Sequence, residues 1–368
     1  MSSQYRDREG AVKLRVHHAL TLAALTLLLA APAARADTPP SGWDRARDPG
    51  ESDAWKLHLR VQALIHAPIA EDVFGLARRR EHEIHCSDAL DLLESADAAH
   101  ARDVRLRFDL GSVVLELAEL GGRLDQYDKG AKILSAAIDA APDDPFVTEA
   151  LGLLADAYAR LDRPEQELAT WRRYIPRLID PRARAVDEMN MGEAEMRLGH
   201  VEEALATFRE VLRECGDLPD SSSTYVLTLW DVAVALDRSG DARGALDMAA
   251  KAARESAIDS HHMPTSGRGL ITHDDHVFFV PEWERWWYLA LGSAALARDS
   301  TDAHDAWAYW AESEHEWGEY VAGASAGREK SQWLAVARLR LAHAHAERVA
   351  AEKRVPRGSK RMPPKDEE

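Results

Sequence analysis

Apolar residues recur at helical spacing through the middle of the chain, most regularly in residues 189–213. Intervals of three and four residues between apolar positions predict helices. Gly199 interrupts the pattern and predicts a tight turn, because glycine adopts a positive φ without steric cost. Gly192 before the turn and Ala204 after it would let two helix backbones approach closely, and Phe208 would fill the space toward the next pair. The segment therefore predicts two antiparallel helices.

The same spacing returns in four further segments; the first four units follow one another at intervals of about 37 to 41 residues, and the last one follows an insertion. They cover residues 108–142, 151–174, 229–253 and 288–311. Self-similarity at a fixed period is typical of repeat proteins, in which each unit buries its apolar face against its neighbours. The sequence therefore predicts an all-α fold built from stacked helix-turn-helix units.

The chain resembles the tetratricopeptide repeat (TPR) family in a set of residues that follow one another in that family's order. They are chiefly Met191, Gly192, Gly199, Ala204 and Phe208. The resemblance covers residues 105–255 well and 285–312 less well, and the intervals exceed the family's usual length of about 34 residues. It implies a right-handed α-solenoid whose concave face binds peptides or protein segments.

The resemblance also places a candidate ligand groove on the first helix of each pair. Family members that bind chaperone tails hold a terminal carboxylate there with Lys, Arg and Asn. The matching positions of this chain contain no basic residue; they are Gly152, Asp156, Met189, Glu193, Trp230 and Val234. The resemblance thus implies a mildly acidic groove with Asp156 and Glu193, with Met189 and Trp230 as apolar anchors. Ordinary solvated helix positions are the alternative interpretation.

The rest of the chain divides by composition and pattern. We expect a signal peptide at 1–36, a linker at 37–52, an N-terminal helical cap at 53–104, TPR-like repeats at 105–256, a His-rich inserted loop at 257–284, the last repeat with capping helices at 285–350, and a disordered tail at 351–368.

The N-terminus has the three parts of a secretory signal peptide. Basic residues precede the apolar run 19–34, and the small-x-small cleavage pattern Ala-Arg-Ala follows at 34–36. The run is shorter than the roughly 20 residues that span a membrane. We therefore expect cleavage and export to the periplasm, with no membrane span in the mature chain; a retained inner-membrane anchor is the alternative. Cys86 and Cys215 would then either form a disulfide or stay separate buried thiols.

The inserted loop is the strongest candidate for a metal-binding site. It carries His261, His262, His273 and His276 together with two Asp within 16 residues. Imidazole and carboxylate groups are ligands of zinc and other divalent metals. The spacing matches no metal motif, however, so a polar surface loop is the other interpretation.

Seven of the 11 Trp residues lie from residue 283 onward, at the end of this insertion and soon after it. Trp286 and Trp287 are adjacent, so they cannot both face one side of a helix. One of them is therefore a candidate for an exposed partner surface, since Trp is enriched at binding hot spots. Packing between the insertion and the last helix pair explains the cluster equally well.

Charge and missing motifs narrow the function. The formal net charge is −17, which disfavours nucleic acid and favours a basic or neutral protein partner. The chain contains no nucleophile elbow, no nucleotide-binding Gly-rich pattern and no haem-attachment motif. We therefore expect no enzyme and no cofactor. The sequence predicts a scaffold or adaptor of the cell envelope that binds a peptide or protein segment; the alternative is a metal-binding protein that uses the His-rich loop.

Overall fold

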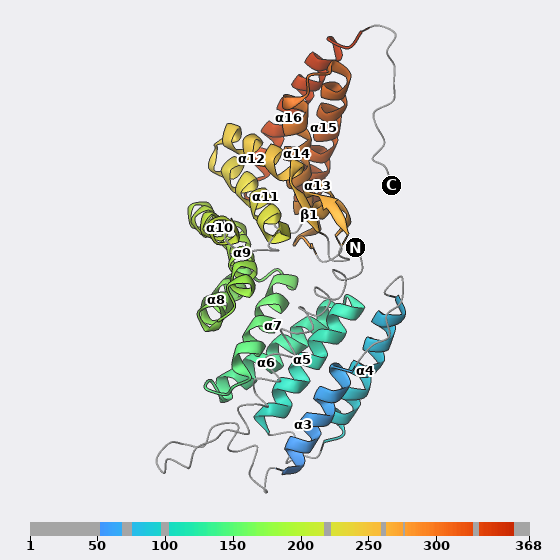
Figure 1. Ribbon diagram of the computed structural model, residues 1–368, viewed down its shortest axis with the longest axis vertical. Helices are drawn as coiled ribbons and strands as arrows, with labels where there is room; N and C mark the ends of the chain where they lie inside the picture. Colours follow the sequence, from blue (N-terminus) through green and yellow to red (C-terminus); the bar gives the residue numbers. More distant parts are fainter. Residues whose placement is uncertain are drawn as a thin grey trace, which may run out of the picture. The chain divides into compact units, whose positions relative to one another are not determined.

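A computed structural model describes residues 52–67, 76–96, 103–216, 222–258, 263–274, 277–326 and 331–356. These residues form helices almost throughout, with one short two-stranded hairpin (Figure 1). The predicted signal peptide, nearly all of the predicted linker and most of the predicted tail lie outside the described residues.

The elements follow one another with short connections. In the first half they are α3 (Ser52–Ile65), α4 (Leu76–Glu94), α5 (Val104–Gly121), α6 (Leu124–Ala140), α7 (Val147–Arg160), α8 (Pro164–Tyr174), η3 (Ile175–Arg177), α9 (Pro181–Arg197) and α10 (Val201–Gly216). In the second half they are α11 (Ser222–Ser239), α12 (Ala242–Arg254), β1 (Ser256–Ile258), β2 (Pro264–Ser266), α13 (Gly267–His273), η4 (Glu282–Glu284), α14 (Arg285–Asp299), α15 (Ala303–Ala326) and α16 (Leu334–Glu352).

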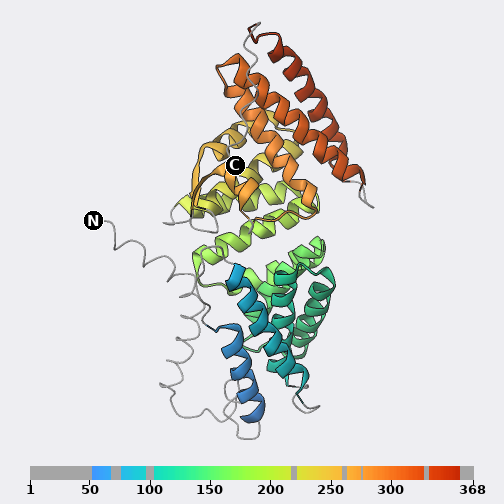
Figure 2. The same ribbon diagram turned by 90° about the vertical axis from the view of Figure 1, so that its right-hand side faces the viewer.

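Helices that are neighbours in the sequence pack as pairs, and each pair packs on the next one. The pairs are α5 with α6, α7 with α8, α9 with α10, α11 with α12, and α14 with α15. Contacts of α6 with α7, α8 with α9, α10 with α11 and α12 with α14 join the pairs, and α16 covers α15 (Figure 2). The predicted all-α solenoid of helix-turn-helix units is confirmed.

The predicted unit at 189–213 is the α9–α10 pair, and its packing follows from residue size. Gly199 in the turn has a φ of +81°. Ala204 and Phe208 are fully buried. A Cβ added to Gly192 would lie 2.5 Å from Cε1 of Phe208, so only glycine permits this approach of the helices.

The segment between α12 and α14 is more ordered than a loop. The strands β1 and β2 pair antiparallel, with Ala257 opposite Thr265, and both β1 and α13 pack against α11. A Cβ added to Gly267 would lie 1.8 Å from the backbone oxygen of Ala252. This close contact fixes the start of α13 beside α12.

The structure also bears on the two thiols and on membrane-spanning helices. Cys86 in α4 and Cys215 in α10 are both buried and do not form a disulfide with each other, so they are separate thiols. Among the described residues, no helix has the length and apolar character needed to cross a membrane.

Candidate ligand pocket

A pocket lies where the first helices of three successive pairs, α7, α9 and α11, meet α14 and the segment 277–280. Its cavity volume is about 120 Å³, which accommodates several water molecules or one side chain. Five carboxylates and two guanidinium groups line it, so negative charge is in excess. The carboxylates are Asp156, Glu167, Glu193, Asp231 and Glu284, and the guanidinium groups are Arg197 and Arg238.

Asp156 and Glu193 occupy equivalent places on α7 and α9. Neither carboxylate makes a hydrogen bond or ion pair with the part of the chain that the structure describes. The Asp156 side chain is exposed to solvent. Desolvation by the atoms around its carboxyl raises its pKa toward about 7, and repulsion from Glu167 adds to this, but contact with water limits the rise. Desolvation likewise raises the pKa of the half-buried Glu193 to about 7.

Asp231 on α11 supplies the third unneutralised carboxylate and is only 2 % exposed. Its Oδ1 accepts a hydrogen bond of 3.0 Å from the hydroxyl of Tyr288 on α14. Its Oδ2 has no hydrogen-bond partner among the described residues. Burial, and then the neighbouring Glu193, raise the pKa of Asp231 well above its usual value. A buried acceptor of this kind is costly unless something donates to it.

The two arginines of the pocket already have carboxylate partners. Arg197 forms an ion pair with Glu167, and Arg238 forms one with Glu284. The Arg238 guanidinium also lies over the ring of Trp287, with 4.7 Å between its Cζ and the ring centroid. Neither arginine forms an ion pair with Asp156, Glu193 or Asp231 in the described structure. Arg197 and Arg238 still oppose the rise in the pKa of Glu193 and of Asp231, respectively, by charge attraction, which compensates these two carboxylates only in part.

Apart from Asn190 and Tyr288, the remaining lining residues are apolar, and half of these come from the inserted segment. Val277, Phe278 and Phe279 line the pocket together with Ile271 of α13. The Phe279 ring packs against Tyr288 with 5.0 Å between centroids. The Arg160 guanidinium lies over the Phe278 ring at 3.5 Å from its centroid, a contact that ties the segment to α7.

The structure brings together three of the four predicted groove residues. Asp156, Met189 and Glu193 all line the pocket. Trp230 requires a correction, because it is fully buried and its indole N–H donates to the Gly267 backbone oxygen at 2.9 Å. It is a core residue that holds α13 against α11.

Sequence reasoning missed Asp231 and the covering segment 277–280. The sequence did contain a signal for this residue, because Asp231 is the one acidic residue in the apolar run 225–236. Carboxylates are rarely buried without a partner, so such a position is a candidate for a binding role. Nothing in the sequence indicated that 277–280 would lie against α7 and α9, since that contact joins units far apart in the chain.

The predicted partner surface at Trp286 and Trp287 also changes. Trp287 is fully buried and packs edge-on against Trp317 and Tyr320 at 5.0 and 4.9 Å between centroids. Trp286 is half-buried, and the Arg285 guanidinium lies 4.9 Å from its ring centroid. Of the adjacent pair, only Trp286 therefore keeps any accessible surface.

The predicted metal ligands are not gathered in the described structure. His261, His262 and His276 lie outside the described residues. His273 is exposed, and its Nδ1 is 2.6 Å from the hydroxyl oxygen of Thr272. No further ligand joins it among the residues that can be placed.

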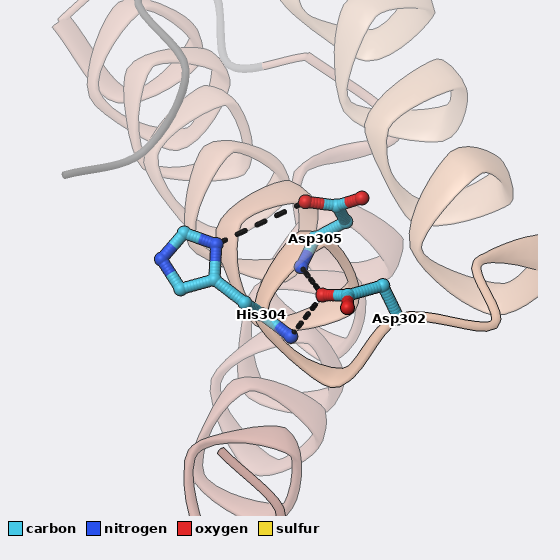
Figure 3. A group of neighbouring side chains, drawn as sticks. All are labelled: Asp302, His304 and Asp305. Carbon is cyan, nitrogen blue, oxygen red and sulfur yellow. Dashed lines mark hydrogen bonds and ion pairs between the residues drawn. The ribbon is translucent and has the colours of Figure 1, made fainter. Parts of the chain in front are cut away.

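A different trio, Asp302, His304 and Asp305, has polar atoms within 4.8 Å of one another (Figure 3). Its geometry has a local explanation. Asp302 Oδ1 accepts the backbone N–H groups of His304 and Asp305 at 2.8 and 3.1 Å. These are the free donors at the start of α15, so the carboxylate caps the helix.

Comparison with known proteins finds only partial likenesses to solved structures. No protein-family model and no curated protein matches the chain. Among solved structures, the chain is similar to "MamA MSR-1 C2" with 18 % identity, covering 56 % of this chain and 95 % of that one, at a TM-score of 0.37. It is similar to "MamA AMB-1 C2221" with 20 % identity, covering 49 % of this chain and 98 % of that one, at a TM-score of 0.37.

Proposed function

We propose that this protein is a non-enzymatic interaction scaffold or adaptor of the cell envelope, and that it binds a segment of a partner protein at the pocket described above. The observation that carries this proposal is the set of unneutralised carboxylates on the first helices α7, α9 and α11. Pockets with apolar walls and a few convergent polar groups are the usual binding sites of proteins.

The chemistry of the pocket favours binding over catalysis. Its lining contains no Ser, Thr, Cys, Lys or His side chain, so the usual nucleophiles and the commonest general base are missing there. Its two guanidinium groups are held in ion pairs with Glu167 and Glu284. What remains is an excess of carboxyl groups over guanidinium groups, which suits recognition of a basic partner.

A matched pair of charge reversals tests the proposal. Glu193→Lys places a positive charge in the pocket, whereas Glu319→Lys makes the same change at an exposed position in the middle of α15. Proteins captured from envelope extracts of the source organism would be quantified for the wild type and both variants. We expect a partner whose capture falls at least tenfold with Glu193→Lys and is unchanged with Glu319→Lys. Equal capture of every protein by all three chains would refute the proposal.

The envelope location has its own test. Export with cleavage after the Ala-Arg-Ala pattern at 34–36 leaves Asp37 as the first residue of the mature chain. N-terminal sequencing of the protein purified from its native cells should find Asp37 in the periplasmic fraction. Recovery of the uncleaved chain from the cytoplasm would contradict export.

A further inference from the structure

We propose that the pocket is a receptor for one arginine side chain of the partner, an inference that rests on the proposed function and specifies its ligand. A guanidinium group inserted between α9 and α11 would donate hydrogen bonds to Oδ2 of Asp231 and to the carboxylate of Glu193, which accept none within the described chain. The partner would thereby be selected for a basic residue at one position.

The pocket contains three carboxyl groups that have no ion-pair partner within the described chain. Asp156, Glu193 and Asp231 line one small cavity, and the two arginines nearby are paired with Glu167 and Glu284. The repulsion between Glu193 and Asp231 is a cost that a bound cation removes, so part of the binding free energy is already stored in the free protein.

The Oδ2 atom of Asp231 is a buried hydrogen-bond acceptor that lacks a donor among the described residues. The side chain is 98 % inaccessible to solvent, lines the cavity, and has its other oxygen fixed by Tyr288. Because Tyr288 holds the carboxylate in one orientation, Oδ2 is a preorganised acceptor with no donor among the described residues. A ligand that donates an N–H at this point gains a buried, charge-assisted hydrogen bond.

The spacing of the carboxylates distinguishes an arginine from a metal ion. Within the described chain, the one group of three potential ligands that converges within 4.8 Å is the helix cap at Asp302, outside the pocket. The pocket carboxylates are therefore too widely spaced for one ion of the size of Ca²⁺ or Zn²⁺. A planar guanidinium with five N–H donors contacts separated carboxylates at the same time.

The apolar walls suit the rest of an arginine side chain. Phe279, Ile271 and Met189 line the same cavity as the carboxylates. The three methylene groups of arginine prefer such surfaces while the charged end contacts polar groups. A cavity volume of about 120 Å³ admits one side chain and no folded segment, so the rest of the partner would stay outside the pocket.

Capped tripeptides provide the test without knowledge of the partner. Acetyl-Ala-Arg-Ala-amide and its citrulline counterpart have nearly the same shape, but citrulline carries no charge. A lysine peptide tests whether charge alone suffices. Each would be titrated at pH 8 into the mature chain by calorimetry, with wild type, Asp231→Asn, Glu193→Gln and the control Asp139→Asn. Asp139 is an exposed carboxylate on α6, outside the pocket.

We expect the arginine peptide to bind wild type and Asp139→Asn equally, and to bind Asp231→Asn and Glu193→Gln at least tenfold more weakly. The citrulline peptide should bind at least tenfold more weakly, and the lysine peptide should fall between the two. Equal affinity of arginine and citrulline, or of wild type and Asp231→Asn, would overturn the inference. If partner capture still fell with Glu193→Lys in that case, the proposed function would stand with a different ligand; if it did not, both would fail.

Discussion

Replacing Glu193 by Gln should stabilise the folded protein at alkaline pH. The carboxyl of Glu193 has its pKa raised from 4.5 to about 7, first by desolvation, while Arg197 opposes and Glu167 adds to the rise. The folded chain therefore holds this proton more tightly than the unfolded chain does. Stability from this group is fully present below pH 4.5 and is lost as the pH rises through 7. Gln is neutral at every pH and avoids the loss.

The size of the effect follows from the same two values. The difference between 4.5 and about 7 corresponds to at most about 3 kcal/mol in the free energy of unfolding. Glu193 is partly accessible, so water screens its charge and the cost is smaller. We expect Glu193→Gln to raise the unfolding free energy by about 1 to 2 kcal/mol at pH 8. Most of that difference should vanish at pH 5, where the folded wild type is largely protonated at this site.

Urea denaturation followed by circular dichroism at pH 5 and pH 8 measures this difference. Glu319→Gln on α15 is the matched control, because it removes one negative charge at an exposed position. The control should leave the pH dependence of the wild type unchanged. If Glu193→Gln raised stability equally at both pH values, or not at all at pH 8, the carboxylate would not be a source of electrostatic cost and our description of the pocket would be wrong.

Glu193→Gln should also bind the partner less well than the wild type does. The substitution should thus raise the stability of the free protein and lower its affinity for the partner. A carboxylate that only supported the fold would lose stability on replacement and leave recognition unchanged. A carboxylate held for a ligand costs stability in the free protein and lowers the free energy of the complex. Measuring both quantities on one Glu193→Gln preparation separates the two roles.

Three further substitutions test the packing, all by urea denaturation. Gly192→Ala should lower the free energy of unfolding by about 1 to 3 kcal/mol, because its Cβ would meet Phe208 at 2.5 Å. Gly318→Ala, whose Cβ would have no atom within 4 Å, should instead raise it by about 0.5 to 1 kcal/mol. Equal effects of the two substitutions would refute the close packing of Gly192 against Phe208. Asp302→Ala should cost about 1 kcal/mol through the lost cap of α15, and no loss would reopen a ligand role for its trio. Trp230→Phe should cost about 1 to 3 kcal/mol by leaving a buried backbone carbonyl unpaired; full stability would contradict its core position.

The fold was predictable because the information for it is local. Apolar spacing, Gly199 in a turn, and the small residues Gly192 and Ala204 lie within one unit of about 25 residues. Each solenoid unit packs mainly on its neighbours, so correct local pairs add up to the correct architecture. The insertion was predicted only as an interruption, because its hairpin and α13 are stabilised by contacts with α11 and α12 that no local pattern records.

The pocket was predictable in part for the same reason. Asp156, Met189 and Glu193 were found because equivalent positions of successive first helices face the same way. Trp230 was misplaced because α13 lies over its face of α11 and buries it. Asp231 was missed because the repeat alignment favoured Val234, one turn further along the same helix.

The inserted segment changes what a repeat groove recognises. A row of first helices presents an open surface along which an extended peptide makes many shallow contacts. Here the segment 277–280 crosses that surface, and the contact of Phe278 with Arg160 holds it against α7. An open acidic surface in water attracts any cation weakly, because solvent screens it. Enclosing Glu193 and Asp231 beneath apolar side chains lowers the local dielectric, which strengthens the attraction for a group that fits and increases the penalty for one that leaves a carboxylate unpaired. In the proposed complex, the insertion would therefore convert a general affinity for basic partners into selection for one side chain.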